Sequence, residues 1–283
     1  MKKFAAVFAV LALCSLSFAV TPTATKIDKQ KEAAAGTAQK AAAAAAQVGR
    51  NATSTCAFTL TSGTKNTYLK YCVTVNGNIT QLETPLGQEH IAVGGFGEGY
   101  GVCDATGGTV AYYDYADFGD SGNWGAPVTT HPTATVVKVV RSTADGIWTL
   151  TQTITQVPGS ASVKIAMALK NNTAVARRAF IVRYADVDAD SVFLNNFDST
   201  INSSWGNNSL FSYGLQLQNV GNPPASVGWV SISQNTPFGP APCNFYANQV
   251  GPEVGVDGSI AILWDNTFAA LAVKTYTATY KGL

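Results

Sequence analysis

Two neighbouring segments alternate apolar and polar residues with the period of a β-strand, and this pattern restricts the fold more than any other feature. In SVKIAMALK, residues 162–170, four apolar side chains share one face and two lysines lie on the other. In IWTLTQTIT, residues 147–155, Trp148, Leu150 and Ile154 share one face. Because side chains on a strand point alternately to opposite faces, each segment predicts a strand with one buried face. The VPGS between them predicts a tight turn, and hence a hairpin.

Further strand-like segments follow from Cys56 to the end of the chain. They include TYLKYCVTV, TVVKVVRST, ARRAFIVRY, GSIAILW and VKTYTATYK, which are rich in β-branched and aromatic residues. Gly, Asn, Pro and Asp separate about 13 such segments, as is typical of sandwiches and barrels. We therefore predict an all-β fold, a large antiparallel two-sheet sandwich over residues 51–283. No Pro- or Ser-rich linker divides this region, so we prefer one domain to two smaller sandwiches.

A second turn, KNNT, follows the segment at residues 162–170. The chain then continues into the strand-like ARRAFIVRY. This order predicts three consecutive antiparallel strands between residue 146 and about residue 186.

The first 19 residues have the organisation of a bacterial secretory signal peptide. Two lysines precede an apolar run from Phe4 to about Leu16, and small residues stand at Ser17 and Ala19, where a signal peptidase needs them. The run is too short to span a bilayer. We predict cleavage after Ala19 and a mature protein that is secreted, periplasmic or at the cell surface, with no membrane span. Cys14 allows a lipoprotein alternative, but a leucine precedes it where a lipobox needs a small residue.

Residues 20–50 differ in composition from the rest of the chain. They are rich in alanine, the best helix former, and contain almost no large apolar side chain. This stretch is predicted to be an arm, helical in part, with little apolar surface to bury. A spacer that holds the domain away from a surface and a frayed N-terminal arm are both consistent with this composition.

Four cysteines remain after removal of the signal peptide, and an even number in an exported chain favours disulfides. Cys56 and Cys72 lie symmetrically about a turn at SGTKN, so we predict that they pair. Cys103 and Cys243 then pair by elimination. The alternative is four free, buried thiols.

Charge and histidine content restrict the classes of function. The 18 basic residues include Lys2 and Lys3, so 16 remain against 17 acidic residues, a net charge of −1 after cleavage. This balance does not favour a nucleic-acid partner. The chain contains only His90 and His131, which weakens any prediction of a histidine metal site or a catalytic triad.

Three aspartates alternate in the segment RYADVDADSV: Asp186, Asp188 and Asp190. On a continuous strand their charges would repel one another, whereas a turn at Asp186 would let the oxygens wrap a hard cation such as calcium. The EF-hand pattern is not followed, because a serine and a phenylalanine stand where that loop has glycine and glutamate. We predict that any metal site is centred here. The alternative is a solvated loop at a strand end, paired with Arg183. Nothing else in the sequence requires a cofactor.

Aromatic rings and carboxylates occur together in YYDYADFGDSGNWG and again in FDSTINSSWGNNSLF. Such groups suit carbohydrates, whose C–H faces stack on rings while their hydroxyls bond to polar side chains. Ordinary long loops held by aromatic anchors have the same composition. The predicted ligand-binding residues are Tyr113, Tyr115, Asp117, Trp124, Asp198 and Trp205.

Several motifs together resemble a group of uncharacterised secreted bacterial β-sandwich proteins. They are YLKYCVTVNGNITQLETPLGQEHI, GEGYGVC, DGIWTLTQTIT, MALKNNT and VRYADVDAD, and they cover most of residues 56–205. The resemblance implies a secreted β-sandwich and carries over no catalytic residue.

Three functional classes fit these observations. The first is a non-catalytic binding module for extracellular carbohydrate. The second is a structural or adhesion protein with a surface protein as partner. The third is a polysaccharide-acting enzyme, which needs a pair of carboxylates at a specific separation. Its acids would come from Glu98, Asp117, Asp186 and Asp188, but their spacing in the sequence does not identify a pair. We expect the binding module.

Overall fold

The structure is a computed structural model of the whole chain, of which residues 55–283 are described with interruptions. Residues 1–54, 92–96, 117–118, 193, 201, 209–212, 222–223, 232–241 and 244–251 are outside the description, and residues 226–231 are described by their backbone alone. The predicted signal peptide, its cleavage site and the alanine-rich arm therefore lie outside the described residues. In the described part, no helix is long and apolar enough to cross a membrane.

The largest sheet has nine antiparallel strands in the order β16-β12-β13-β14-β18-β10-β9-β8-β7. Its strands are β7 (Val128–Thr133), β8 (Val136–Ser142), β9 (Trp148–Gln156), β10 (Ser162–Asn171), β12 (Asn195–Thr200), β13 (Ser203–Asn208), β14 (Gly214–Asn219), β16 (Glu253–Val256) and β18 (Val273–Gly282). The last strand, β18, lies in the middle of this sheet, between β14 and β10.

Two smaller antiparallel sheets complete the regular structure of the described residues. The six-stranded sheet, in the order β15-β17-β11-β4-β5-β6, contains β4 (Glu98–Asp104), β5 (Val110–Tyr115), β6 (Gly119–Asp120), β11 (Arg177–Asp186), β15 (Ser226–Ser231) and β17 (Gly258–Phe268). The three-stranded sheet contains β1 (Phe58–Ser62), β2 (Leu69–Val73) and β3 (Ile79–Glu83). Two 3₁₀ turns, η1 (Lys65–Thr67) and η2 (Ala189–Ser191), are the helical elements found there.

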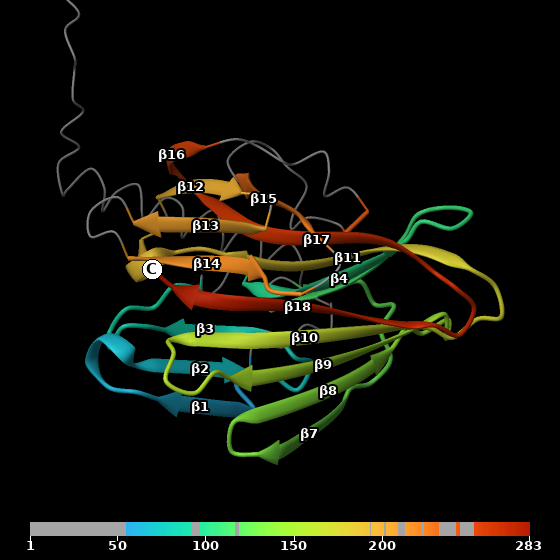
Figure 1. Ribbon diagram of the computed structural model, residues 1–283, viewed down its shortest axis with the longest axis horizontal. Coiled ribbons are helices and arrows are strands. Elements are labelled where there is room, and N and C mark those ends of the chain that lie inside the picture. Colours follow the sequence, from blue (N-terminus) through green and yellow to red (C-terminus); the bar gives the residue numbers. More distant parts are fainter. Residues whose placement is uncertain are drawn as a thin grey trace, which may run out of the picture.

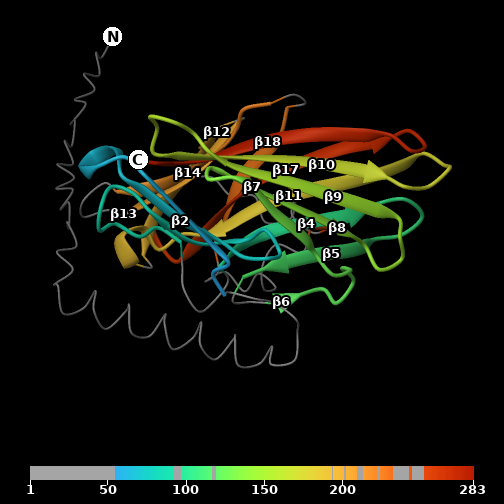
Figure 2. The same ribbon diagram turned by 90° about the horizontal axis from the view of Figure 1, so that it is seen from below.

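The nine-stranded sheet forms one layer of a sandwich, and the two smaller sheets together form the other (Figure 1). Figure 2 shows β18 and β10 on one side and β4 and β5 on the other. One continuous apolar core draws buried residues from all three sheets. Its largest members include Trp148, Trp264, Tyr71, Tyr100 and Tyr280. The predicted all-β antiparallel sandwich is confirmed.

Strands β9 and β10 show how the alternating pattern determines the fold. Val163, Ile165, Met167 and Leu169 are all fully buried, and the two lysines on the other face, Lys164 and Lys170, are exposed. The two strands pair in antiparallel register, and the backbone N–H of Ser160 donates to the carbonyl of Val157 in the turn. The predicted hairpin is confirmed.

The third strand of the predicted series lies in the other layer. After β10 the chain crosses to β11, which pairs with β4 and β17 and not with β10. The Asn171 side chain donates to the carbonyls of Val175 and Ala269 and so holds the crossing in place. The second turn was therefore predicted correctly as a turn, but the expectation that it joins paired strands is wrong.

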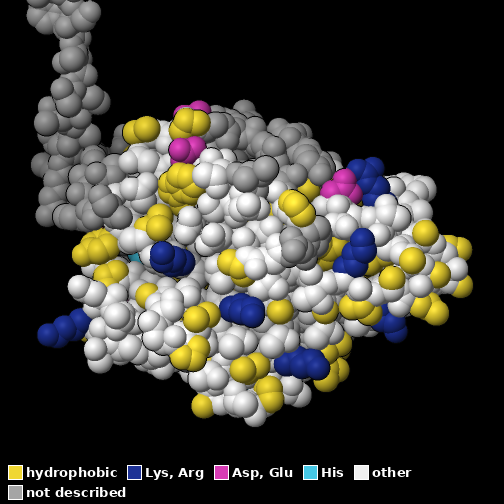
Figure 3. All heavy atoms as spheres, viewed as in Figure 1, with side chains coloured by type: hydrophobic (Ala, Val, Ile, Leu, Met, Phe, Trp, Pro, Cys, Tyr) yellow, Lys and Arg dark blue, Asp and Glu magenta, His cyan; other side chains and the backbone are white. Residues whose placement is uncertain are grey.

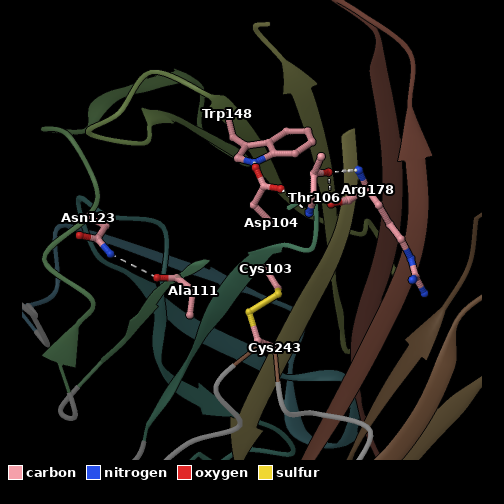
Figure 4. The surroundings of a disulfide bond; sticks show 8 residues. All are labelled: Cys103, Asp104, Thr106, Ala111, Asn123, Trp148, Arg178 and Cys243. Carbon is pink, nitrogen blue, oxygen red and sulfur yellow. Dashed lines mark hydrogen bonds between the residues drawn. A yellow bond between two sulfur atoms is a disulfide. The ribbon is translucent and has the colours of Figure 1, made fainter. Parts of the chain in front are cut away.

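Both predicted disulfides are present, Cys56–Cys72 and Cys103–Cys243. The second joins Cys103 of β4 to Cys243, which packs against buried side chains on the outer side of the six-stranded sheet (Figure 4). Close packing accompanies it, because a Cβ atom on Gly101 would lie 2.9 Å from the ring of Pro242. Glycine at position 101 therefore lets Pro242, beside the disulfide, approach the sheet.

Candidate functional site

A buried ion pair lies between the two layers. Glu98 of β4 and Arg183 of β11 contact each other, and neither side chain is exposed. Glu98 also accepts hydrogen bonds from the backbone N–H of Ile79 and the hydroxyl of Tyr280, and Arg183 donates to the amide oxygen of Gln152. Burial raises the pKa of Glu98, against the opposing effect of the Arg183 charge. Glu98, considered above as a catalytic acid, is thus enclosed in the core.

A second buried ionic group connects β5, β6 and β8. The guanidinium of Arg141 contacts the carboxylate of Asp114 and lies 3.7 Å from that of Asp120. Asn76 donates to Asp114 at 2.8 Å. Burial raises the pKa of Asp114 to about 6, although Arg141 acts in the opposite direction. The sequence pattern indicates that Arg141 is buried, because it lies on the same face of β8 as the buried Val137 and Val139.

The acidic stretch lies at the end of β11, as predicted, but its members separate. Asp186 and Asp188 come together with Asp257, and one carboxylate oxygen from each lies within 4.8 Å of the others. Asp186 is fully buried and accepts a hydrogen bond from Ser259. Asp190 is placed instead in the turn η2, with a φ of 57°. The carboxylates that could hold a cation are therefore those of Asp186, Asp188 and Asp257.

The calcium prediction can now be tested at specific residues, because Asp257 and not Asp190 joins Asp186 and Asp188. We expect saturating calcium to raise the melting temperature, because a cation that binds only the folded state stabilises it by about 2.7 kcal/mol at ~100 times its dissociation constant. The rise should disappear in Asp257→Asn, which removes a ligand charge. Asp190→Asn, a matched change in the same stretch, should keep it. Identical melting curves in calcium and in EDTA would rule out the metal site.

The two Tyr-Ala-Asp segments of the sequence meet in space. The rings of Tyr115 and Tyr184 lie 5.2 Å apart, and Tyr113 stacks on Tyr115 at 5.4 Å. All three belong to the outer face of the six-stranded sheet. Tyr113 is half-buried, whereas Tyr115 is only 1% exposed. Asp117 lies outside the described residues.

Trp124, another predicted ligand-binding residue, packs into the core. It is 8% exposed, and its ring lies edge-on to those of Tyr100 and Tyr112. The guanidinium of Arg141 lies 5.4 Å from its ring centroid. Trp124 therefore closes one side of the Arg141 group and offers little surface to a ligand.

Asp198 and Trp205 lie on paired strands and not in a long loop, which was the alternative explanation for the composition of their segment. Asp198 of β12 is directly opposite Trp205 of β13. The neighbouring Phe197 is buried beneath Gly206, so Asp198 and Trp205 point to the opposite, solvent face of the nine-stranded sheet. Both side chains are half-buried. The register brings together two of the predicted residues that sequence separation alone could not place side by side.

The same row continues across the sheet. Trp205 is opposite Gln216 of β14, and Gln216 is opposite the exposed Lys281 of β18. We call Asp198, Trp205, Gln216 and Lys281 the polar row. It crosses the strands at right angles, and directly opposed side chains stand about 5 Å apart. Figure 3 views this face, over which basic side chains are distributed, with acidic ones towards its margins.

Comparisons with known proteins place the fold. No protein-family model and no curated protein matches the sequence. A bacterial glucoamylase, solved in complex with acarbose, matches in structure with a TM-score of 0.57 and 9% identity, over 82% of this chain and 33% of that one. A GalM/aldose epimerase homologue from C. elegans matches with a TM-score of 0.51 and 8% identity, over 80% of this chain and 98% of that one. The chain thus spans about a third of the glucoamylase, and what it shares with both proteins is the β-sandwich fold.

Proposed function

We propose that this is an exported, carbohydrate-binding β-sandwich protein that holds a polysaccharide chain on the polar row. The observation that carries the proposal is the cross-strand register, which places Asp198, Trp205, Gln216 and Lys281 in one line on the solvent face. The described residues place these four side chains on four adjacent strands of the large sheet.

The chemistry of the row suits a sugar chain. The half-buried ring of Trp205 offers a flat surface for the C–H face of a sugar ring. On either side, Asp198 accepts hydrogen bonds, and the amide of Gln216 both donates and accepts. The Gln216 amide is oriented by Ser203, to whose hydroxyl it donates at 3.3 Å. Side chains fixed on paired strands lose little freedom on binding, which favours affinity.

Two further observations support the proposal. The glucoamylase that shares the fold was solved with acarbose, and the second neighbour is an aldose epimerase homologue, so related scaffolds occur in carbohydrate-acting proteins. Disulfides persist in oxidising compartments, so the two observed here support the export predicted from the signal sequence.

Replacing Trp205 by alanine should weaken polysaccharide binding about 30-fold, or about 2 kcal/mol, as for the loss of a central aromatic anchor. Trp205→Phe keeps a ring and should retain part of the affinity. Binding is measured by the retardation of the native protein in gels that contain neutral or acidic polysaccharides.

Val128→Ala is the control, because Val128 is exposed at the far β7 edge of the same sheet. It should migrate as the unchanged protein does. If no polysaccharide retards the protein, or if Trp205→Ala is retarded as strongly as Val128→Ala, the proposed function is wrong.

A further inference from the structure

We propose that the binding surface extends from the polar row over Lys164 and Lys138, and that its ligand is a polysaccharide bearing acidic groups. This inference rests on the proposed function and names the class of carbohydrate. It is carried by a diagonal of lysines on the solvent face of the nine-stranded sheet.

The strand register sets the course of this diagonal. Lys281 is opposite Ser162 and Lys164 is opposite Thr279, so the two lysines are diagonal neighbours on β18 and β10, about 7–8 Å apart. Lys138 of β8 continues the diagonal on the far side of β9, where it is opposite Thr153. From β12 to β8 the whole surface crosses six strand spacings, about 29 Å. This is the shape of a site for an extended chain.

The charge on this face is one-sided, although the whole chain is nearly neutral. Lys138, Lys164, Lys170 and Lys281 are exposed on strands β8, β10 and β18, and all have the parity that points away from the core. None of the outward-facing residues described on these three strands is acidic, and Asp198 lies on β12, at the other end of the polar row. Positive charge on an open surface attracts and orients anionic ligands.

The lysine charges are not balanced by ion pairs within the described residues. The salt bridges there involve Lys70 and four arginines, and three of those arginines pair with carboxylates of the core-facing side. The ammonium groups of Lys138, Lys164 and Lys281 are thus available to a ligand.

Protection of sheet edges does not account for these lysines. Exposed lysines are commonly placed on edge strands, where they discourage pairing with another chain. Here β18 is the central strand of a nine-stranded sheet, β10 is its neighbour and β8 is an inner strand next to the edge, and the edges themselves are β16 and β7. Lys281, Lys164 and Lys138 therefore all lie on strands that are paired on both sides, and none of them shields an unpaired edge.

Hydroxyl groups fill the surface between the charges. Thr153 and Thr155 of β9, and Thr279 of β18, are half-buried and lie directly opposite Lys138 or Lys164. Hydroxyls both donate and accept hydrogen bonds, as sugar hydroxyls do. Alternating ammonium and hydroxyl groups match a ligand that alternates acidic groups and hydroxyls.

The test compares two ligands with the same backbone, polygalacturonate and its fully methyl-esterified form, which lacks the charges. We expect the native protein to bind polygalacturonate at least about tenfold more tightly at low salt, and added salt to reduce the difference, because screening weakens exposed charge pairs. Dextran sulfate against dextran repeats the comparison with sulfate in place of carboxylate.

Lys138→Glu/Lys164→Glu should lose this preference while still binding the esterified form through Trp205. The matched control is Lys65→Glu, because Lys65 is an exposed lysine of η1, in the opposite layer. Thermal melting first verifies that the native protein and both variants are folded.

The outcomes separate this inference from the proposed function. If the protein binds polygalacturonate and its methyl-esterified form equally well, and Trp205→Ala loses this binding, the proposed function stands. The inference that the ligand is acidic is then wrong. Loss of the preference in Lys65→Glu as well overturns the lysine diagonal. Binding to anionic lipid vesicles without binding to any polysaccharide overturns both proposals, as does binding to none of these probes.

Discussion

Arg183→Met is expected to reduce the free energy of unfolding by about 3–5 kcal/mol, because it leaves the Glu98 carboxylate buried without its cation. The pair lies between the layers, with both side chains fully buried. The burial that raises the pKa of Glu98 then acts without an opposing charge, so the carboxyl becomes protonated or the core opens to water. Urea denaturation measures the loss.

The same strand provides a matched control. Arg178 of β11 pairs with Asp265, but its side chain is 53% exposed. Arg178→Met should therefore cost less than about 1 kcal/mol, as for surface ion pairs. Arg183→Met/Glu98→Leu removes both buried charges and should recover much of the loss. Equal effects of Arg183→Met and Arg178→Met would contradict the structural role assigned to the buried pair.

Removal of the Cys103–Cys243 disulfide should reduce the free energy of unfolding more than removal of Cys56–Cys72. Cys103 and Cys243 are 140 residues apart, whereas Cys56 and Cys72 are 16 apart. Since cross-linking restricts the unfolded chain more when the loop is longer, Cys103→Ala/Cys243→Ala should cost about 5 kcal/mol and Cys56→Ala/Cys72→Ala about 3 kcal/mol.

Denaturation of both double variants, with the same measurement on the reduced native protein, tests this order. The reduced protein should be less stable than either variant, because it lacks both links. A larger loss from the short loop would show that local packing, and not loop closure, determines what these disulfides contribute.

The parts of the fold that could be predicted from sequence are those decided by local pattern. Alternation over residues 162–170 determined which face of β10 is buried, and the turn signal determined its pairing with β9. The cysteine pairing followed from an even number and one symmetric turn. The crossing from β10 to β11 could not be read in this way, because a turn signal does not state whether the next strand joins the same sheet.

The residues of the candidate sites are brought together by the pairing of strands that are distant in the sequence. Their grouping could therefore not be predicted from sequence spacing. Asp257 joins Asp186 and Asp188 only because β17 pairs with β11, and the spacing of the three nearby aspartates pointed to Asp190 instead. Likewise, Trp205 lies beside Gln216, and through it Lys281, only because β13, β14 and β18 are adjacent. The burial of Arg141 could have been predicted, because it is a charged residue on the apolar face of an alternating strand.

The central position of β18 has a consequence for biosynthesis. Of the described strands it is made last, yet it separates β14 from β10 in the finished sheet. Until it arrives, the nascent polypeptide has two half-sheets, each with an unpaired edge where β18 will insert. Such edges invite association with other chains, and closing the gap requires contacts between distant parts of the polypeptide, which slows folding. A chain assembled in this order gains from being kept unfolded by holdase chaperones until translation ends.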